Sequence, residues 1–157
     1  MMINIQKKLH HRPPYLMIDE VLHADSSQIL ATKKTKVSDF FIAGHFPGAH
    51  VVPGAMMQEM TTQAAGILLA EFYSPVPDYD SSITKGHALG VLRSVQKAKY
   101  KSFVRPEQTL LITVKLIDQL ESSFRFKGEI KVDSKVVMMN EFTLINISDE
   151  KILDEKC

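Results

Sequence analysis

The stretch PGAMMQEMTTQAAGILLAEF, residues 53–72, decides the fold of this 157-residue chain. Its apolar residues do not alternate as they would in a strand, and its length suits about five turns of α-helix. Proline fits the first turn, where its missing N–H would have no partner. Because the helix would be apolar almost all round, we expect other structure to wrap it. The stretch therefore predicts a long, buried central helix at residues 53–72.

Segments on both sides of this helix alternate like strands and are bounded by turn residues. Two precede the helix, at residues 15–23 and 28–37, and four follow it, at residues 88–103, 108–120, 123–132 and 135–147. An antiparallel sheet curled around one helix belongs to the α+β class. The length favours a single domain, residues 1–157. The turn-rich segment 74–87 is expected to be an exposed excursion.

Composition excludes several classes of function. The net charge of +1, from 19 basic and 18 acidic residues, argues against binding nucleic acid through bulk charge. The single cysteine, Cys157, provides neither a disulfide framework nor a cysteine metal site, and this favours a reducing, cytoplasmic compartment. No stretch has the apolar character of a signal peptide or a membrane span. Since no metal-binding spacing such as HExxH occurs either, we expect no metal and no cofactor.

The candidate catalytic residues lie in a loop rich in glycine and proline, residues 38–53, and in the helix that follows it. Glu59 lies in the otherwise apolar helix, so burial should raise its pKa and make it a proton donor near neutral pH. Gln63 lies four positions later, on the same helix face. His45, in the loop, is a candidate base. Gly54 stands at the helix N-terminus, where an unpaired N–H favours a developing negative charge.

Each of these residues also has an ordinary structural interpretation. A loop histidine or a helix glutamate can be structural rather than catalytic. A methionine-rich helix is most often simply core, although flexible thioethers also suit a tunnel for an acyl chain. The remaining histidines are interpreted as surface or structural residues: His10, His11, His23, His50 and His87.

The segment GHFPGAHVVPGAMMQEMTTQ, residues 44–63, resembles the signature of the hotdog-fold β-hydroxyacyl-[acyl carrier protein] dehydratases of fatty acid synthesis. Other parts of the chain resemble the same family: HRPPYLMIDEV at 11–21, KAKYKSFVRPEQ at 97–108 and FKGEIKVDSKVV at 126–137. The resemblance implies a hotdog fold, in which an antiparallel sheet wraps around a long central helix. The chain departs from the family in its longer 74–87 segment.

The resemblance also implies roles. His45 would remove the C2 proton of a (3R)-hydroxyacyl thioester, and Glu59 would protonate the departing 3-hydroxyl, so that water and a trans-2-enoyl thioester form. The Gly54 N–H would bind the thioester carbonyl, Gln63 would orient Glu59, and Phe46 would contact substrate. In this family the site is shared across a homodimer, either alone or as a trimer of dimers. Glutamate at position 59 resembles the branch that only dehydrates.

The partner implied by the resemblance is an acyl carrier protein. Lys97, Lys99 and Lys101 alternate, so on a strand they share a face that could dock this acidic partner or could simply be solvated. Three other functions stay open at this point: a hotdog acyl thioesterase, a dehydratase of a specialised polyene or lipid pathway, and a noncatalytic acyl-binding protein.

Overall fold

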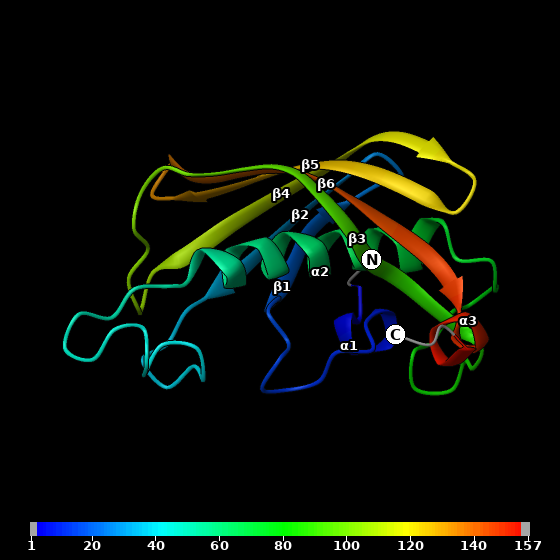
Figure 1. Ribbon diagram of the computed structural model, residues 1–157, viewed down its shortest axis with the longest axis horizontal. Helices are drawn as coiled ribbons and strands as arrows, with labels where there is room; N and C mark the ends of the chain where they lie inside the picture. Colours follow the sequence, from blue (N-terminus) through cyan, green and yellow to red (C-terminus); the bar gives the residue numbers. More distant parts are fainter. Residues whose placement is uncertain (1–2, 155–157) are drawn as a thin grey trace.

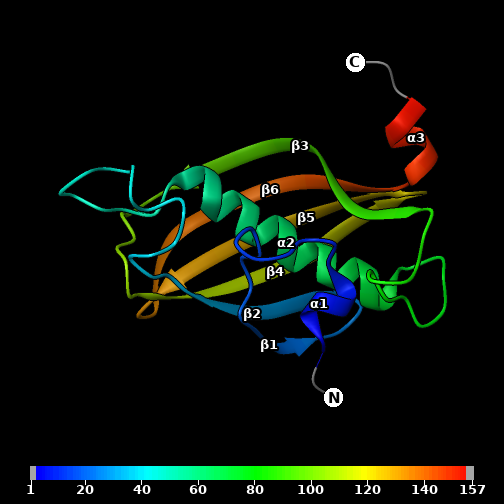
Figure 2. The same ribbon diagram turned by 90° about the horizontal axis from the view of Figure 1, so that it is seen from below.

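A six-stranded antiparallel sheet wraps around one long helix in this computed structural model, which describes residues 3–154 (Figures 1 and 2). The elements in chain order are α1 (Ile5–Lys8), β1 (Glu20–Ala24), β2 (Gln28–Lys34), α2 (Gly54–Phe72), β3 (His87–Tyr100), β4 (Thr109–Leu120), β5 (Ser123–Val132), β6 (Lys135–Ser148) and α3 (Asp149–Asp154). The strand order is β1-β2-β4-β5-β6-β3. The expected α+β architecture is therefore confirmed.

Helix α2 is the core of the molecule. It begins after Pro53, which caps it in an extended conformation, and it ends where the Tyr73 N–H bonds the Leu69 carbonyl. Along its middle, side chains all round the helix are buried, because the curved sheet covers one side while α1 and the segment after it lie against another (Figure 2). Met60 and Leu68 are fully buried. Burying each such side chain contributes about 1.5–3 kcal/mol to the stability of the fold.

The first strand is shorter than the sequence indicates. Strand β1 begins at Glu20 rather than at Tyr15, because backbone groups of Tyr15 and Met17 bond to a helix side chain instead of a neighbouring strand. The Asp19 N–H already bonds β2, at the Thr32 carbonyl. The Met17 N–H donates to Gln63 Oε1 and the Tyr15 carbonyl accepts from Gln63 Nε2, both at 2.8 Å. This segment is thereby laid directly over α2.

The segment between α2 and β3 is not exposed throughout, contrary to the expectation for residues 74–87. Tyr79 is only 2% exposed. Ser81 binds the N-terminal segment, since its N–H donates to the Lys7 carbonyl and its hydroxyl lies 2.7 Å from the Leu9 carbonyl oxygen. Lys7 also lies 3.4 Å from Asp80. The excursion is therefore packed against α1 for part of its length.

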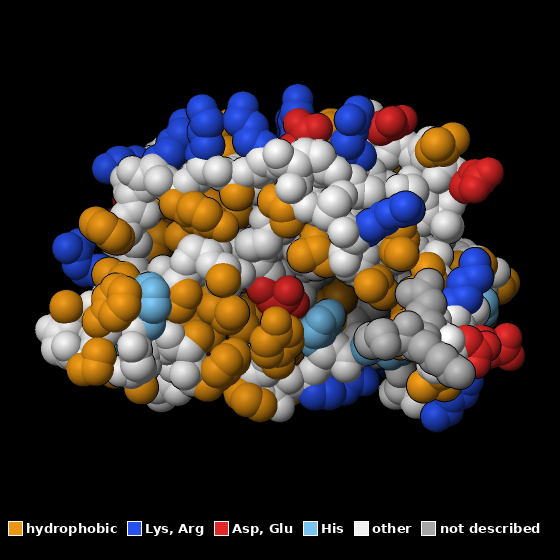
Figure 3. All heavy atoms as spheres, viewed as in Figure 1, with side chains coloured by type: hydrophobic (Ala, Val, Ile, Leu, Met, Phe, Trp, Pro, Cys, Tyr) orange, Lys and Arg blue, Asp and Glu red, His pale blue; other side chains and the backbone are white. Residues whose placement is uncertain are grey.

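Strand β3 forms one edge of the sheet and pairs only with β6. It approaches α2 closely at Gly90, whose φ is +74° and where a Cβ would lie 2.9 Å from the Gly66 Cα. Exposed apolar side chains follow the strand, including Leu92, Val95 and Tyr100. Hydrophobic patches cover much of the face shown in Figure 3. A long strand with an open edge and apolar neighbours is a ready surface for pairing with another chain.

Among the described residues, no helix combines the length and apolar character that crossing a membrane requires.

Candidate active site

The loop before α2 holds the His45 imidazole in one orientation. His45 Nδ1 lies 3.0 Å from the Val51 carbonyl oxygen, and the Val51 N–H donates to the His45 carbonyl at 2.9 Å. Because a carbonyl oxygen can only accept, Nδ1 carries the hydrogen in the neutral ring and Nε2 keeps its lone pair. The Phe46 ring stacks on the imidazole with centroids 4.2 Å apart. The geometry therefore presents Nε2 as a base.

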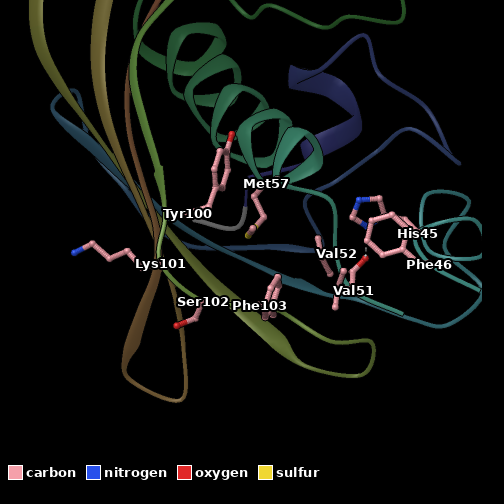
Figure 4. Close-up of a pocket in the computed structure, with 10 residues that line it drawn as sticks. His45, Phe46, Val51, Val52, Met57, Tyr100, Lys101, Ser102 and Phe103 are labelled. Carbon is pink, nitrogen blue, oxygen red and sulfur yellow. Dashed lines mark hydrogen bonds between the residues drawn. The ribbon is translucent and has the colours of Figure 1, made fainter. Parts of the chain in front are cut away.

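A cavity of about 390 Å³ lies in front of this imidazole (Figure 4). His45 and Phe46 line one side, while Tyr100 and the residues after it line the other. The loop is anchored there because the Val52 N–H donates to the Val104 carbonyl at 2.7 Å. The cavity is mostly apolar, as a pocket for an acyl chain should be.

Gly54 opens helix α2 at the wall of the same cavity. As the first residue of the helix, its N–H has no carbonyl of the helix to bond, so it is available to an anionic ligand atom. A Cβ at this position would lie 2.9 Å from the Tyr100 ring. Glycine therefore lets the tyrosine ring approach the start of the helix.

Glu59 is fixed by Gln63, one helical turn away. The Gln63 amide is 1% exposed, and its Nε2 donates to Glu59 Oε1 at 2.8 Å. The amide cannot be turned over, because its oxygen accepts from the Met17 N–H and its nitrogen donates to the Tyr15 carbonyl. Burial raises the pKa of Glu59 above its ordinary value, and the hydrogen bond from Gln63 opposes part of that rise. The carboxyl is thus positioned and suited to hold a proton.

Glu59 lines a second cavity, of about 400 Å³, which shares no lining residue with the cavity at His45. One chain therefore does not bring the two groups into a common pocket. The second cavity is bounded by residues before β1, by α2 and by the first half of β3. It also contains His11, whose Nε2 lies 3.5 Å from Glu59 Oε1. The sequence alone indicates a surface or structural role for His11 and does not reveal this contact with Glu59.

Lys97, Lys99 and Lys101 line one groove of about 350 Å³, on the side of the sheet away from α2, together with Lys127 and Glu141. Figure 3 shows lysine and arginine side chains gathered along the upper edge of the molecule, where Figure 1 places the sheet. Lys101 also lines the His45 cavity, so the basic groove adjoins it.

Within residues 3–154, no group of three or more His, Cys, Asp or Glu side chains is arranged to hold a metal ion.

A match to a protein-family model shows the family to which this chain belongs. The model of the FabA-like domain matches residues 9–141, most of the chain. This protein belongs to the FabA-like domain family. The matched residues include both His45 and Glu59, so the family domain contains both halves of the candidate site.

Curated relatives match most of the chain. A protein of Anaeromyxobacter sp. named 3-hydroxyacyl-[acyl-carrier-protein] dehydratase FabZ is 32% identical over 88% of this chain and 84% of its own. A protein of Shewanella loihica with the same name is 36% identical over 87% of this chain and 86% of its own. The expected resemblance to the 3-hydroxyacyl-[acyl carrier protein] dehydratases is thereby confirmed.

Solved structures show the fold of this FabA-like domain. The Dehydratase Heterocomplex ApeI:P from Xenorhabdus doucetiae has a TM-score of 0.80 at 17% identity, covering 98% of this chain and 97% of that one. Zebra fish Thioesterase Superfamily Member 2 has a TM-score of 0.57 at 14% identity, covering 80% of this chain and 79% of that one. At these identities the likeness concerns the fold alone, and it confirms the expected hotdog fold.

Proposed function

We propose that this protein is a hydro-lyase of fatty acid biosynthesis that converts (3R)-hydroxyacyl-[acyl carrier protein] into the trans-2-enoyl thioester and water. The observation that carries the proposal is the pair of groups in a FabA-like domain: an imidazole with a free Nε2 and a carboxyl whose pKa is raised by burial. Both relatives are named as 3-hydroxyacyl-[acyl-carrier-protein] dehydratases, which supports this class of reaction.

The proposed mechanism uses four groups of the chain. His45 Nε2 takes the proton from C2, and the electrons of that C–H bond move toward the thioester carbonyl. The Gly54 N–H stabilises the negative charge that develops on the carbonyl oxygen. The new C2–C3 double bond then forms as the C3–O bond breaks, and Glu59 gives its proton to the leaving hydroxyl. Gln63 keeps the Glu59 carboxyl in position throughout.

The active site is proposed to form between two subunits of a homodimer. Within one chain the two groups line separate cavities, so a complete site needs the His45 of one protomer opposite the Glu59 of another. The open edge of β3, with Leu92 and Val95 exposed beside it, supports pairing of two copies along this strand. The homodimer can stand alone or associate into a trimer of dimers.

The carrier protein is proposed to dock on the groove lined by Lys97, Lys99 and Lys101. Its position next to the His45 cavity supports this assignment, since a carrier must deliver its thioester there. Reversing the charge of these three lysines should raise KM for carrier-bound substrate and leave KM for a small thioester analogue unchanged. Equal effects on both substrates would reject the dock. A cytoplasmic location belongs to the same proposal; Cys157, on which that expectation depends, lies outside the described residues.

The test is an assay of hydration and dehydration with 3-hydroxyacyl and trans-2-enoyl carrier thioesters of several lengths. We expect His45→Ala and Glu59→Gln each to lower the rate by about 10²-fold or more. Enoyl product from the wild type supports the dehydratase. Free acid without enoyl product would instead indicate a thioesterase, and binding without turnover would indicate an acyl-binding protein.

A further inference from the structure

His11 is the one histidine that the described residues place against Glu59. It lies in the segment between α1 and β1, and its Nε2 is 3.5 Å from Glu59 Oε1. Gln63 donates to this same oxygen at 2.8 Å. Two nitrogen-bearing side chains, 52 residues apart in the sequence (63 − 11), therefore approach one oxygen of the candidate acid.

The His11 ring is held on the same scaffold as Gln63. It stacks on the Tyr15 ring, with centroids 5.8 Å apart and planes inclined by 23°. The Tyr15 carbonyl is the group that accepts from Gln63 Nε2. Behind the ring, Arg12 donates to the His11 carbonyl at 2.9 Å. The imidazole, the amide and the carboxyl thus share one set of supports, which is the arrangement that a positioning residue requires.

The surroundings of His11 favour one neutral tautomer. Burial, followed by the charges of His10 and Arg12, lowers the pKa of His11, so the ring is neutral near pH 7. Its Nδ1 is buried and has no hydrogen-bond partner among the described residues. A hydrogen on Nδ1 would therefore be a buried donor without an acceptor, and it would leave the Nε2 lone pair facing Glu59 Oε1. The hydrogen belongs on Nε2.

We propose that His11 is a positioning residue for Glu59: together with Gln63 it engages Oε1, so that Oε2 is the oxygen that carries the proton exchanged with substrate. This rests on the proposed function. The contact matters most after Glu59 has given up its proton, because an N–H donor stabilises the carboxylate. The other ionisable groups around His11 and Glu59 in the described part of the chain are His10, Arg12 and Tyr15 on the same segment and Asp149 on α3.

Two substitutions distinguish the contribution of the aromatic ring of His11 from that of its Nε2–H donor. His11→Phe keeps an aromatic ring to stack on Tyr15 but removes the donor, whereas His11→Gln keeps an N–H donor near the position of Nε2. His23→Phe is the matched control, because His23 is an exposed histidine that bonds Asp25 instead. We expect His11→Phe to lower kcat by about tenfold with KM nearly unchanged, and His11→Gln to recover most of the loss. The control should match the wild type.

Two further measurements test whether His11 acts through Glu59. In a Glu59→Gln background, His11→Phe should cost nothing more, because a residue that acts through Glu59 has nothing left to position. A ¹³C NMR titration of the Glu59 carboxyl should move to higher pH in His11→Phe and return in His11→Gln. An unchanged titration, or an equal rate loss in the Glu59→Gln background, would overturn the inference. A wild type without dehydratase activity would refute the proposed function instead, while the titration would still decide the contact.

Discussion

Replacing Gln63 by leucine should destabilise the fold and disturb the candidate acid together. The substitution keeps an apolar side chain of similar size and removes three hydrogen bonds, to Met17, Tyr15 and Glu59, each of 2.8 Å. Met17 is fully buried, so its N–H would lose its hydrogen bond inside the protein, at a cost of about 1–3 kcal/mol. Tyr15 is 40% exposed, so water can partly replace the amide at its carbonyl.

The free energy of unfolding should therefore fall by about 2–4 kcal/mol in Gln63→Leu, as measured by urea unfolding at constant protein concentration. Because the Gln63 donor lowers the pKa of Glu59, its removal should move the Glu59 titration to higher pH. The rate of dehydration should fall by about tenfold or more, since the carboxyl also loses its orientation.

A matched control comes from the neighbouring glutamine of the same helix. Gln58 accepts from Asn140 Nδ2 at 2.8 Å and donates to Thr62 at 3.2 Å, but has no hydrogen bond to Glu59. Gln58→Leu should thus lower stability while leaving the Glu59 titration in place. If Gln63→Leu were as stable as the wild type, or if both variants moved the titration equally, the reasoning from these contacts would be refuted.

Three other predictions concern single positions. Burial raises the pKa of Glu59 in the folded state above its ordinary value of 4.5. The free energy of unfolding of the wild type should therefore decline as pH rises from 4.5 toward the raised pKa, and that of Glu59→Gln should decline less over the same interval, as measured by urea unfolding. Gly128→Ala should cost about 2–4 kcal/mol, because the new Cβ would lie 2.1 Å from Asn140 Oδ1, and adding Asn140→Ala should recover part of the loss in thermal unfolding. Gly54→Ala should stay folded while displacing the exposed Tyr100 ring, so that KM for an acyl thioester rises in steady-state kinetics.

The features predicted well from the sequence are those set by local geometry. The apolar run of residues 53–72 has one regular structure available to it, and the structure has a helix at Gly54–Phe72. The four-residue spacing from Glu59 to Gln63 brings two side chains together in any helix, and the hydrogen bond between them is present. The helix and the proximity of these two side chains follow from local spacing, whereas the orientation of the Gln63 amide is set by Met17 and Tyr15.

The features that were missed depend on partners distant in the sequence. The segment from Tyr15 to Asp19 alternates like a strand, but Gln63 bonds the Tyr15 carbonyl and the Met17 N–H, and no pattern within the segment reveals that competitor. His11 reaches Glu59 only because the same segment crosses the helix. The pairing of His45 with Glu59 across two subunits, which the resemblance implied, stays a proposal, because spacing within one sequence does not describe a second copy of the chain.

Mixing two inactive variants tests the shared site most directly. His45→Ala and Glu59→Gln each remove one half of the machinery, and a mixed dimer contains one site with both halves intact. After subunit exchange at equal amounts, half of the dimers are mixed and each has one working site of two, so the account predicts about a quarter of wild-type dehydratase activity. If exchange is demonstrated and the mixture stays as inactive as its components, the two residues do not act across a dimer, and the central claim is contradicted.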